Sequence, residues 1–172
     1  MISQIGHHVG KNIVFGFDHH GLPEVDAYAR VMSEHGLVMS AVHGDTPHYL
    51  SSTQRVCERV RGRTDAMGVL LCSTGMGVSI AANKFSGIYA ARCLTVEDAQ
   101  LARTINNCNV LCLALKSTLD LNAQIIDAFM TTAYEGRKLE QLSRITLLEH
   151  DLVPHDRVLM ESQRVRARAK SV

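Results

Sequence analysis

The 172-residue sequence predicts an α/β fold, a doubly wound three-layer α/β/α sandwich built around a five-stranded parallel sheet. Short apolar runs rich in β-branched residues alternate along the chain with longer segments whose apolar residues recur at helical spacing. This alternation is typical of a parallel sheet that helices cover on both faces. No linker or internal repeat interrupts the pattern, so we expect a single domain over residues 1–172.

Each expected strand is a short apolar run. In chain order the runs are NIVFGFD at 12–18, LVMSAV at 37–42, MGVLLC at 67–72, GIYAARC at 87–93 and NVLCLAL at 109–115. The expected helices fill the longer intervals, at about 22–35, 49–60, 77–84, 95–105 and 118–133. In the last of these, Leu121, Ile125 and Phe129 are four residues apart and therefore share one helix face. These elements form a core over residues 12–133.

The pattern changes after residue 133. Residues 134–172 are charged, helical in period up to about 150, and interrupted at Pro154. A helix that follows a finished sheet often covers a neighbouring subunit. We therefore expect a C-terminal helical extension and tail that pack on a second copy, in a homodimer or larger homo-oligomer.

Composition excludes several classes of protein. No apolar run approaches the ~18 residues that a membrane span needs, and a net charge of +1 provides no field to attract nucleic acid. The basic residues at 164–170 are better explained as a solvated tail than as a binding arm. The start of the sequence lacks the pattern of a secretory signal, so we expect a cytoplasmic protein. Five cysteines without a CxxC pair predict reduced thiols.

In doubly wound sheets, ligands bind where the carboxyl ends of strands lead into helices. At one such point the sequence reads CSTGMG, over residues 72–77. The two glycines allow a tight turn, the following helix offers free N–H groups to an anion, and the same field favours a thiolate at Cys72. The alternative is that Cys72 is an inert thiol closing an apolar strand. The accompanying turn favours a functional cysteine.

The first strand-to-helix turn carries Asp18, His19 and His20. A carboxylate beside an imidazole suits proton transfer or hydroxyl binding, whereas the alternative is an Asp helix cap with exposed histidines. Adjacent histidines are expected to diverge, and HExxH does not occur, so we expect no catalytic metal. The turn, GFDHHG, also lacks the G-x-G-x-x-G pattern of dinucleotide sites, and we expect no cofactor. Farther along, Asn106 lies at an expected helix end, where it is either a structural cap or an amide contact to sugar hydroxyls.

Taken together, Asp18-His19, CSTGMGVSIAANKFSGI at 72–88, NNCNVL at 106–111 and YEG at 134–136 identify a resemblance. The chain resembles the family of ribose-5-phosphate isomerase B and galactose-6-phosphate isomerase over residues 12–145. The resemblance implies a Rossmann-like sandwich, assembled as dimers or tetramers with the active site between subunits. It also implies a metal-free aldose–ketose isomerase that acts on a small sugar phosphate, by default ribose 5-phosphate and ribulose 5-phosphate.

The resemblance assigns roles residue by residue. Cys72 matches the family's base, which moves a proton between two sugar carbons through a cis-enediol, and Thr74 and the backbone N–H groups of its turn would stabilise the enediolate. The implied substrate-binding residues are Asp18, His19, Ser73, Gly75, Met76, Gly77 and Asn106. The implied phosphate-binding residue Lys116 stands where the family has an arginine, and Arg137 and Lys138 are this chain's own candidates, with a solvated helix face as the alternative reading.

Two positions depart from the family pattern. Ile105 occupies the position of the histidine that opens the sugar ring, and Leu142 occupies that of the last phosphate-binding arginine. Asp18, His19 or His20 could open the ring instead, or the substrate could be an open-chain tetrose phosphate. Two further alternatives are the cysteine-bearing subunit of a heteromeric isomerase, with a paralogue supplying the missing groups, and a sugar-phosphate-binding subunit without activity. A thiol-dependent hydrolase or transferase is less favoured, because no histidine partner of Cys72 is evident.

Overall fold

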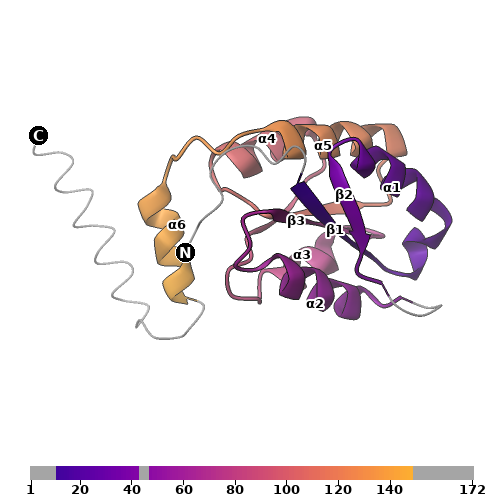
Figure 1. Ribbon diagram of the computed structural model, residues 1–172, viewed down its shortest axis with the longest axis horizontal. Coiled ribbons are helices and arrows are strands. Elements are labelled where there is room, and N and C mark those ends of the chain that lie inside the picture. Colours follow the sequence, from indigo (N-terminus) through magenta and orange to yellow (C-terminus); the bar gives the residue numbers. More distant parts are fainter. Residues whose placement is uncertain (1–10, 43–46, 149–172) are drawn as a thin grey trace, which may run out of the picture.

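The computed structural model describes residues 11–42 and 47–148, and in them the predicted five-stranded parallel sheet is confirmed (Figure 1). The strands are β1 Lys11–Phe17, β2 Gly36–Ser40, β3 Ala66–Cys72, β4 Ala90–Arg92 and β5 Val110–Ala114. They pair in the order β2-β1-β3-β5-β4, and every pair is parallel. All seven residues of the central strand β3 are buried, as expected for a strand covered on both faces.

The helices are η1 His19–Glu24, α1 Val25–Ser33, α2 Tyr49–Val60, α3 Met76–Ala82, α4 Val96–Thr104, α5 Leu119–Thr131 and α6 Leu139–Leu148. Figure 1 shows α1, α4 and α5 on one side of the sheet and α2 and α3 on the other. The buried residues accordingly divide into two clusters, one containing Tyr28 and Phe129 and the other Val56 and Val78. The three-layer prediction is therefore confirmed.

Two expected elements differ from those in the structure. The strand expected at 87–93 shortens to Ala90–Arg92, because the Asn109 side chain takes the backbone bonds that a longer ladder would use. Its Oδ1 accepts from Tyr89 N (2.9 Å) and its Nδ2 donates to Gly87 O (2.9 Å). The helix expected at 22–35 begins as the 3₁₀ turn η1, which contains Pro23, and is α-helical only from Val25.

The extension after α5 begins with the helix α6, which lies to one side of the sandwich in Figure 1. Tyr89, which directly precedes β4, holds this helix. Its Oη donates to Leu142 O (3.2 Å) and lies 2.7 Å from Thr146 Oγ1. Leu142 is buried, so the leucine that departs from the family pattern anchors this helix. The expected tail at 149–172, including its basic residues, lies outside the described residues. Within the described chain, no helix has the length and apolar character that a membrane crossing needs.

Candidate active site

The carboxyl edge of the sheet brings together the first group of predicted site residues. Asp18 follows β1 and donates its backbone N–H to Leu71 O (3.3 Å), which places it beside the end of β3. Beyond the strands, Leu115 N donates to Cys72 O (3.0 Å) and Lys116 N to Ser73 O (3.3 Å). The backbone of Lys116 is thereby fixed next to the CSTGMG loop. Asp18, the loop and Lys116 thus lie on three adjacent strands, as the sequence predicts.

Cys72 is the last residue of β3 and is 6% exposed. Its Sγ lies 3.2 Å from Gly75 N, which points its N–H at the sulfur. An N–H directed at sulfur stabilises negative charge there, so the geometry suits a thiolate. The site therefore supplies a sulfur next to the loop where a ligand would be held.

The other four cysteines have a different environment. Cys57, Cys93, Cys108 and Cys112 are buried and free. Burial raises the pKa of Cys57, Cys93 and Cys108 to about 12 and that of Cys112 well above its ordinary value. These thiols remain protonated at neutral pH, which agrees with the expectation that they serve packing.

Two glycines of the loop are required by their surroundings. Gly75 has φ +71°, and a Cβ there would lie 3.2 Å from the Leu113 carbonyl group of the neighbouring strand. A Cβ on Gly77 would lie 3.3 Å from the Tyr49 ring at the start of α2. The loop is consequently pressed between β5 on one side and α2 on the other, which fixes its path.

The remaining loop residues are partly accessible. Thr74 Oγ1 accepts from Met76 N (3.3 Å), so its own hydroxyl proton is available to a ligand. Ser73 is half-buried, and Met76 is exposed. The helix α3 begins at Met76 and has only seven residues, about one turn fewer than an average helix. Side chains and loop N–H groups therefore matter more here than the helix dipole.

Asp18 acts as a helix cap beside the end of β3. Its Oδ1 accepts from His20 N (3.0 Å), and its Oδ2 lies 3.4 Å from His20 Nδ1. The rings of His19 and His20 lie against each other with centroids 3.9 Å apart and planes tilted by 37°, so the expectation that they diverge is wrong. Because one 3₁₀ turn carries both, their nitrogens and the carboxylate lie within 4.8 Å of one another and could geometrically hold a metal ion. The absence of a catalytic metal stays a prediction.

Three predicted site residues lie at the opposite, amino edge of the sheet. Asn106 follows the end of α4 and precedes β5, while Arg137 and Lys138 follow the end of α5. The two ends meet where Glu135 N donates to Thr104 O (3.3 Å). Val110, the first residue of β5, pairs with Gly68 of β3, and Cys72 lies four residues farther along β3. At about 3.3 Å per residue, the two edges of the sheet lie roughly 13 Å apart. One chain therefore does not unite these residues with Cys72.

The turn that carries Asn106 is rigidly held. Arg103 is fully buried, donates from Nη1 to Asn107 Oδ1 (3.1 Å) and to Cys108 O, and stacks on Phe129. Burial lowers the pKa of Arg103 to about 10, which still leaves it charged at neutral pH. Asn107 adopts φ +48°, the left-handed conformation expected of an asparagine at this helix end. Asn106 itself is exposed and makes the amide available at the surface.

The sequence prediction missed two residues beside the loop. Tyr49 packs on Gly77, and Arg92 donates from Nε to Thr74 O (2.7 Å). Arg92 had a detectable signal, because it is a cation within the apolar run GIYAARC, near the carboxyl end of an expected strand. Tyr49 had none, since it reaches the loop only through the packing of α2 on α3.

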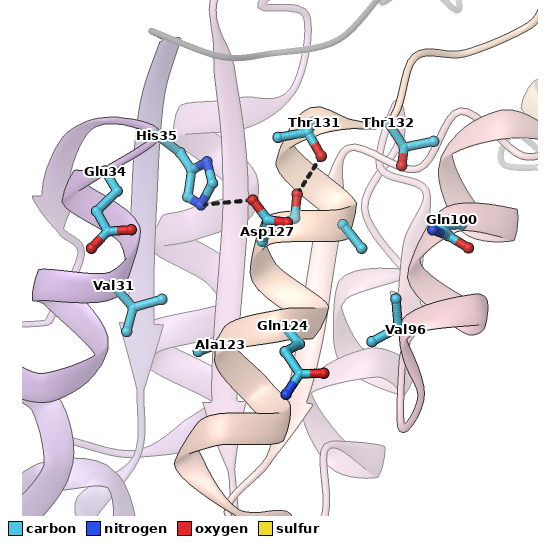
Figure 2. Close-up of a pocket in the computed structure, with 11 residues that line it drawn as sticks. Val31, Glu34, His35, Val96, Gln100, Ala123, Gln124, Asp127, Thr131 and Thr132 are labelled. Carbon is cyan, nitrogen blue, oxygen red and sulfur yellow. Dashed lines mark hydrogen bonds and ion pairs between the residues drawn. The ribbon is translucent and has the colours of Figure 1, made fainter.

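A groove elsewhere on the molecule contains none of the predicted site residues. Figure 2 shows it over α5, with α1 on one side and α4 on the other. Its volume is about 580 Å³, and His35 Nε2 lies 3.8 Å from Asp127 Oδ1 across it. The groove belongs to the helical layer on the far side of the sheet from α3. It has no connection with Cys72.

Comparison with known proteins decides the family. Residues 13–146 match the family described as Ribose/Galactose Isomerase. The chain belongs to this family. Ribose-5-phosphate isomerase B of Escherichia coli is 37% identical over 147 residues, covering 81% of this chain and 97% of the relative. The resemblance predicted from the sequence motifs is thereby confirmed.

Two further relatives widen the comparison. The structure of ribose-5-phosphate isomerase B from Mycoplasma genitalium with bound ribulose-5-phosphate has a TM-score of 0.76 and 30% identity, covering 83% of this chain and 99% of that one. The D-erythrulose-4-phosphate isomerase of Pectobacterium atrosepticum is 33% identical over 109 residues, covering 62% of this chain and 72% of the relative. Isomerases of different sugar phosphates thus occur among the relatives.

The environments of the five cysteines predict selective alkylation. At pH 8, a thiol of pKa about 12 is ionised in roughly one molecule in ten thousand, so Cys57, Cys93 and Cys108 should stay unmodified in the folded protein. Iodoacetamide should modify Cys72 first, as located by peptide mass spectrometry. A Cys72→Ser variant is the control and should react at least tenfold more slowly. Equal modification of a second cysteine in the wild type would contradict the assignment.

Proposed function

We propose that this chain is an aldose–ketose isomerase of a small sugar phosphate, by default ribose 5-phosphate and ribulose 5-phosphate, with Cys72 as the base. The observation that carries the proposal is the Gly75 N–H directed at Cys72 Sγ, in a loop that lies one strand away from Asp18. Family membership supports the reaction class. The combination suits a reaction in which a proton leaves and returns while negative charge develops on a neighbouring oxygen.

In this mechanism the Cys72 thiolate removes the C2 proton of the open-chain aldose. The electron pair forms the C1–C2 double bond of a cis-enediolate, while charge moves onto the C1 oxygen. The thiol then returns the proton to C1, and the proton of the O2 hydroxyl passes to O1, which gives the ketose with its C1 hydroxyl. The Thr74 hydroxyl and the loop N–H groups would stabilise the enediolate, and Asp18 and His19 would hold or relay hydroxyl protons.

A second copy of the chain would complete the site. Asn106 and Lys138 lie at the amino edge, roughly 13 Å from the level of Cys72, and both are exposed. In a two-fold dimer, the amino edge of each subunit can face the carboxyl edge of its partner and so form two equivalent sites. Asn106 would then contact sugar hydroxyls, and Lys138 and Arg137 would approach the phosphate. Arg137 already pairs with Glu135 (2.5 Å), which favours Lys138 as the freer cation.

The first test removes the base. Cys72→Ala should lower exchange of the C2 proton with deuterium by at least a thousandfold, as followed by NMR with ribose 5-phosphate and ribulose 5-phosphate. The melting temperature should change little, since the sulfur is replaced at the end of a strand. Cys112→Ala, a buried cysteine in the neighbouring strand, is the matched control and should retain exchange. Wild-type exchange by Cys72→Ala would exclude this cysteine as the base.

The second test concerns the shared site. Cys72→Ala and Asn106→Ala should each be nearly inactive alone. Subunit exchange between them should restore up to about a quarter of the wild-type activity, because about half of the dimers become hybrids and each hybrid contains one intact site of two. No recovery after verified subunit exchange would mean that the two residues do not act in one site. If the wild-type chain is active only after a paralogue is added, the heteromeric alternative holds, and persistent binding without turnover indicates a non-catalytic subunit.

A specific residue favours a second candidate function, the isomerisation of an open-chain tetrose phosphate. Ile105 occupies the position of the family's ring-opening histidine, and its side chain transfers no proton. A tetrose 4-phosphate cannot form the five-membered ring that ribose 5-phosphate forms, so it needs no such acid. The relative from Pectobacterium atrosepticum is named for a tetrulose phosphate.

The choice between substrates can be measured directly. If the tetrose candidate is correct, kcat/KM for erythrulose 4-phosphate should exceed that for ribulose 5-phosphate by at least tenfold. Ile105→His should then raise activity on the pentose phosphate and leave activity on the tetrose phosphate within about twofold. Efficient turnover of ribose 5-phosphate by the wild-type chain would favour the pentose and assign ring opening to Asp18, His19 or His20.

A further inference from the structure

Arg92 lies on the same face of the sheet as Cys72, two strands away. It pairs with Cys112 of β5, which in turn pairs with Leu70 of β3. Side chains of paired residues in a parallel sheet point to the same face, and Leu70, Cys72 and Cys112 belong to one cluster. The Arg92 side chain therefore extends over the α3 side of the sheet, toward the loop that follows Cys72.

The arginine is anchored to that loop by one edge of its guanidinium. Its Nε donates to Thr74 O (2.7 Å), and its Cγ would lie 3.3 Å from a Cβ on Gly75. Among the described residues this is its one hydrogen bond, and no carboxylate oxygen of these residues lies within 4 Å of its nitrogens. The bond fixes the orientation of the planar group while Nη1 and Nη2 stay available. Two parallel N–H donors of this kind match two oxygens of a phosphate.

The charges around the loop are asymmetric. Lys116 N is bonded to Ser73 O on the β5 side, and Arg92 reaches Thr74 from β4 beyond it. On the other side, next to β1, lies the Asp18 carboxylate. Asp98 lies on the arginine side, and its Oδ2 accepts the N–H groups of Leu94 and Thr95 (2.9 and 3.0 Å). These hydrogen bonds, and to a smaller extent the charge of Arg92, lower the pKa of the Asp98 carboxyl group. The helix cap therefore already uses that carboxylate, and Arg92 and Lys116 supply the cations on the β4–β5 side of the loop.

We propose that Arg92 binds the phosphate of the substrate within the same chain that supplies Cys72. The sugar hydroxyls would lie toward Asp18, the reacting carbon at Cys72, and the phosphate on the flank formed by Arg92 and Lys116. In the assembled dimer, Asn106, Arg137 and Lys138 of the second copy would then add to these contacts. The identity of the substrate in this assignment rests on the proposed function. The binding of a phosphate group by Arg92 does not depend on it. It also provides a guanidinium in a chain where Leu142 replaces an arginine of the family pattern.

Inorganic phosphate tests the proposal without turnover. Arg92→Gln should weaken its binding to the full-length protein by roughly tenfold to a hundredfold, as measured by calorimetry, the loss expected for a charge-assisted bond. Arg59→Gln is the matched control, because Arg59 likewise donates to a backbone carbonyl, Ser40 O (2.9 Å), but lies on α2 beside the opposite edge of the sheet. Arg59→Gln should bind phosphate as the wild type does. Absence of phosphate binding by the wild type would overturn the proposal.

Kinetics separates phosphate binding from simple support of the loop. With the preferred sugar phosphate, Arg92→Gln should raise KM at least tenfold and change kcat less than threefold, and Arg92→Lys should recover part of the loss. A lower kcat with unchanged KM and unchanged phosphate affinity would make Arg92 a brace for Thr74 and refute the proposal. If the wild type lacks isomerase activity but loses phosphate affinity on substitution of Arg92, the proposed function fails and the phosphate site stands.

Discussion

The extension of parallel pairing past the end of β3 is the constraint on which the candidate site depends. The β3–β5 ladder ends formally at Cys72 and Ala114, yet Leu115 and Lys116 continue to donate backbone N–H groups to Cys72 and Ser73. This pins the first residues of the loop to a rigid neighbour. The left-handed Gly75 then turns the chain back so that its N–H meets the cysteine sulfur. A loop held in this way needs no reorganisation to stabilise charge.

The same backbone constraint explains why the predicted site residues divide between the two edges of the sheet. In a parallel α/β sheet all strands end at one edge, so residues that follow helices must lie at the other. Asn106 and the segment after α5 follow helices, and the buried Arg103 holds them there. A chain with this topology holds the two groups of predicted site residues about a strand's length apart. Assembly with a second copy is a direct way to combine them, and it would connect activity to oligomerisation.

Much of the fold, and the grouping of the residues that follow β1, β3 and β5, were predictable from sequence. Alternating apolar runs gave five strands near their true positions, and α2 was predicted with its exact bounds. The strand at β4 was overestimated, because Asn109 replaces part of its ladder with side-chain bonds, a contact between residues 20 positions apart. The carboxyl-edge residues could be grouped, since each follows an expected strand. Arg92 was overlooked because a cation inside an expected strand can be noticed in the sequence, but the loop that its side chain contacts depends on the order of the strands.

The sequence by itself determined the chemistry that this protein has available. A cysteine before a Ser-Thr-Gly-x-Gly turn, an Asp-His pair after the first strand and an apolar Ile105 are local facts, independent of how the strands are ordered. Only the tertiary structure decided which of these groups meet. Placing β5 between β3 and β4 brings Lys116 and Arg92 to one flank of the cysteine loop, and the direction of α4 and α5 sends Asn106 to the far edge. Strand order is set by packing among distant residues, so no local pattern encodes it.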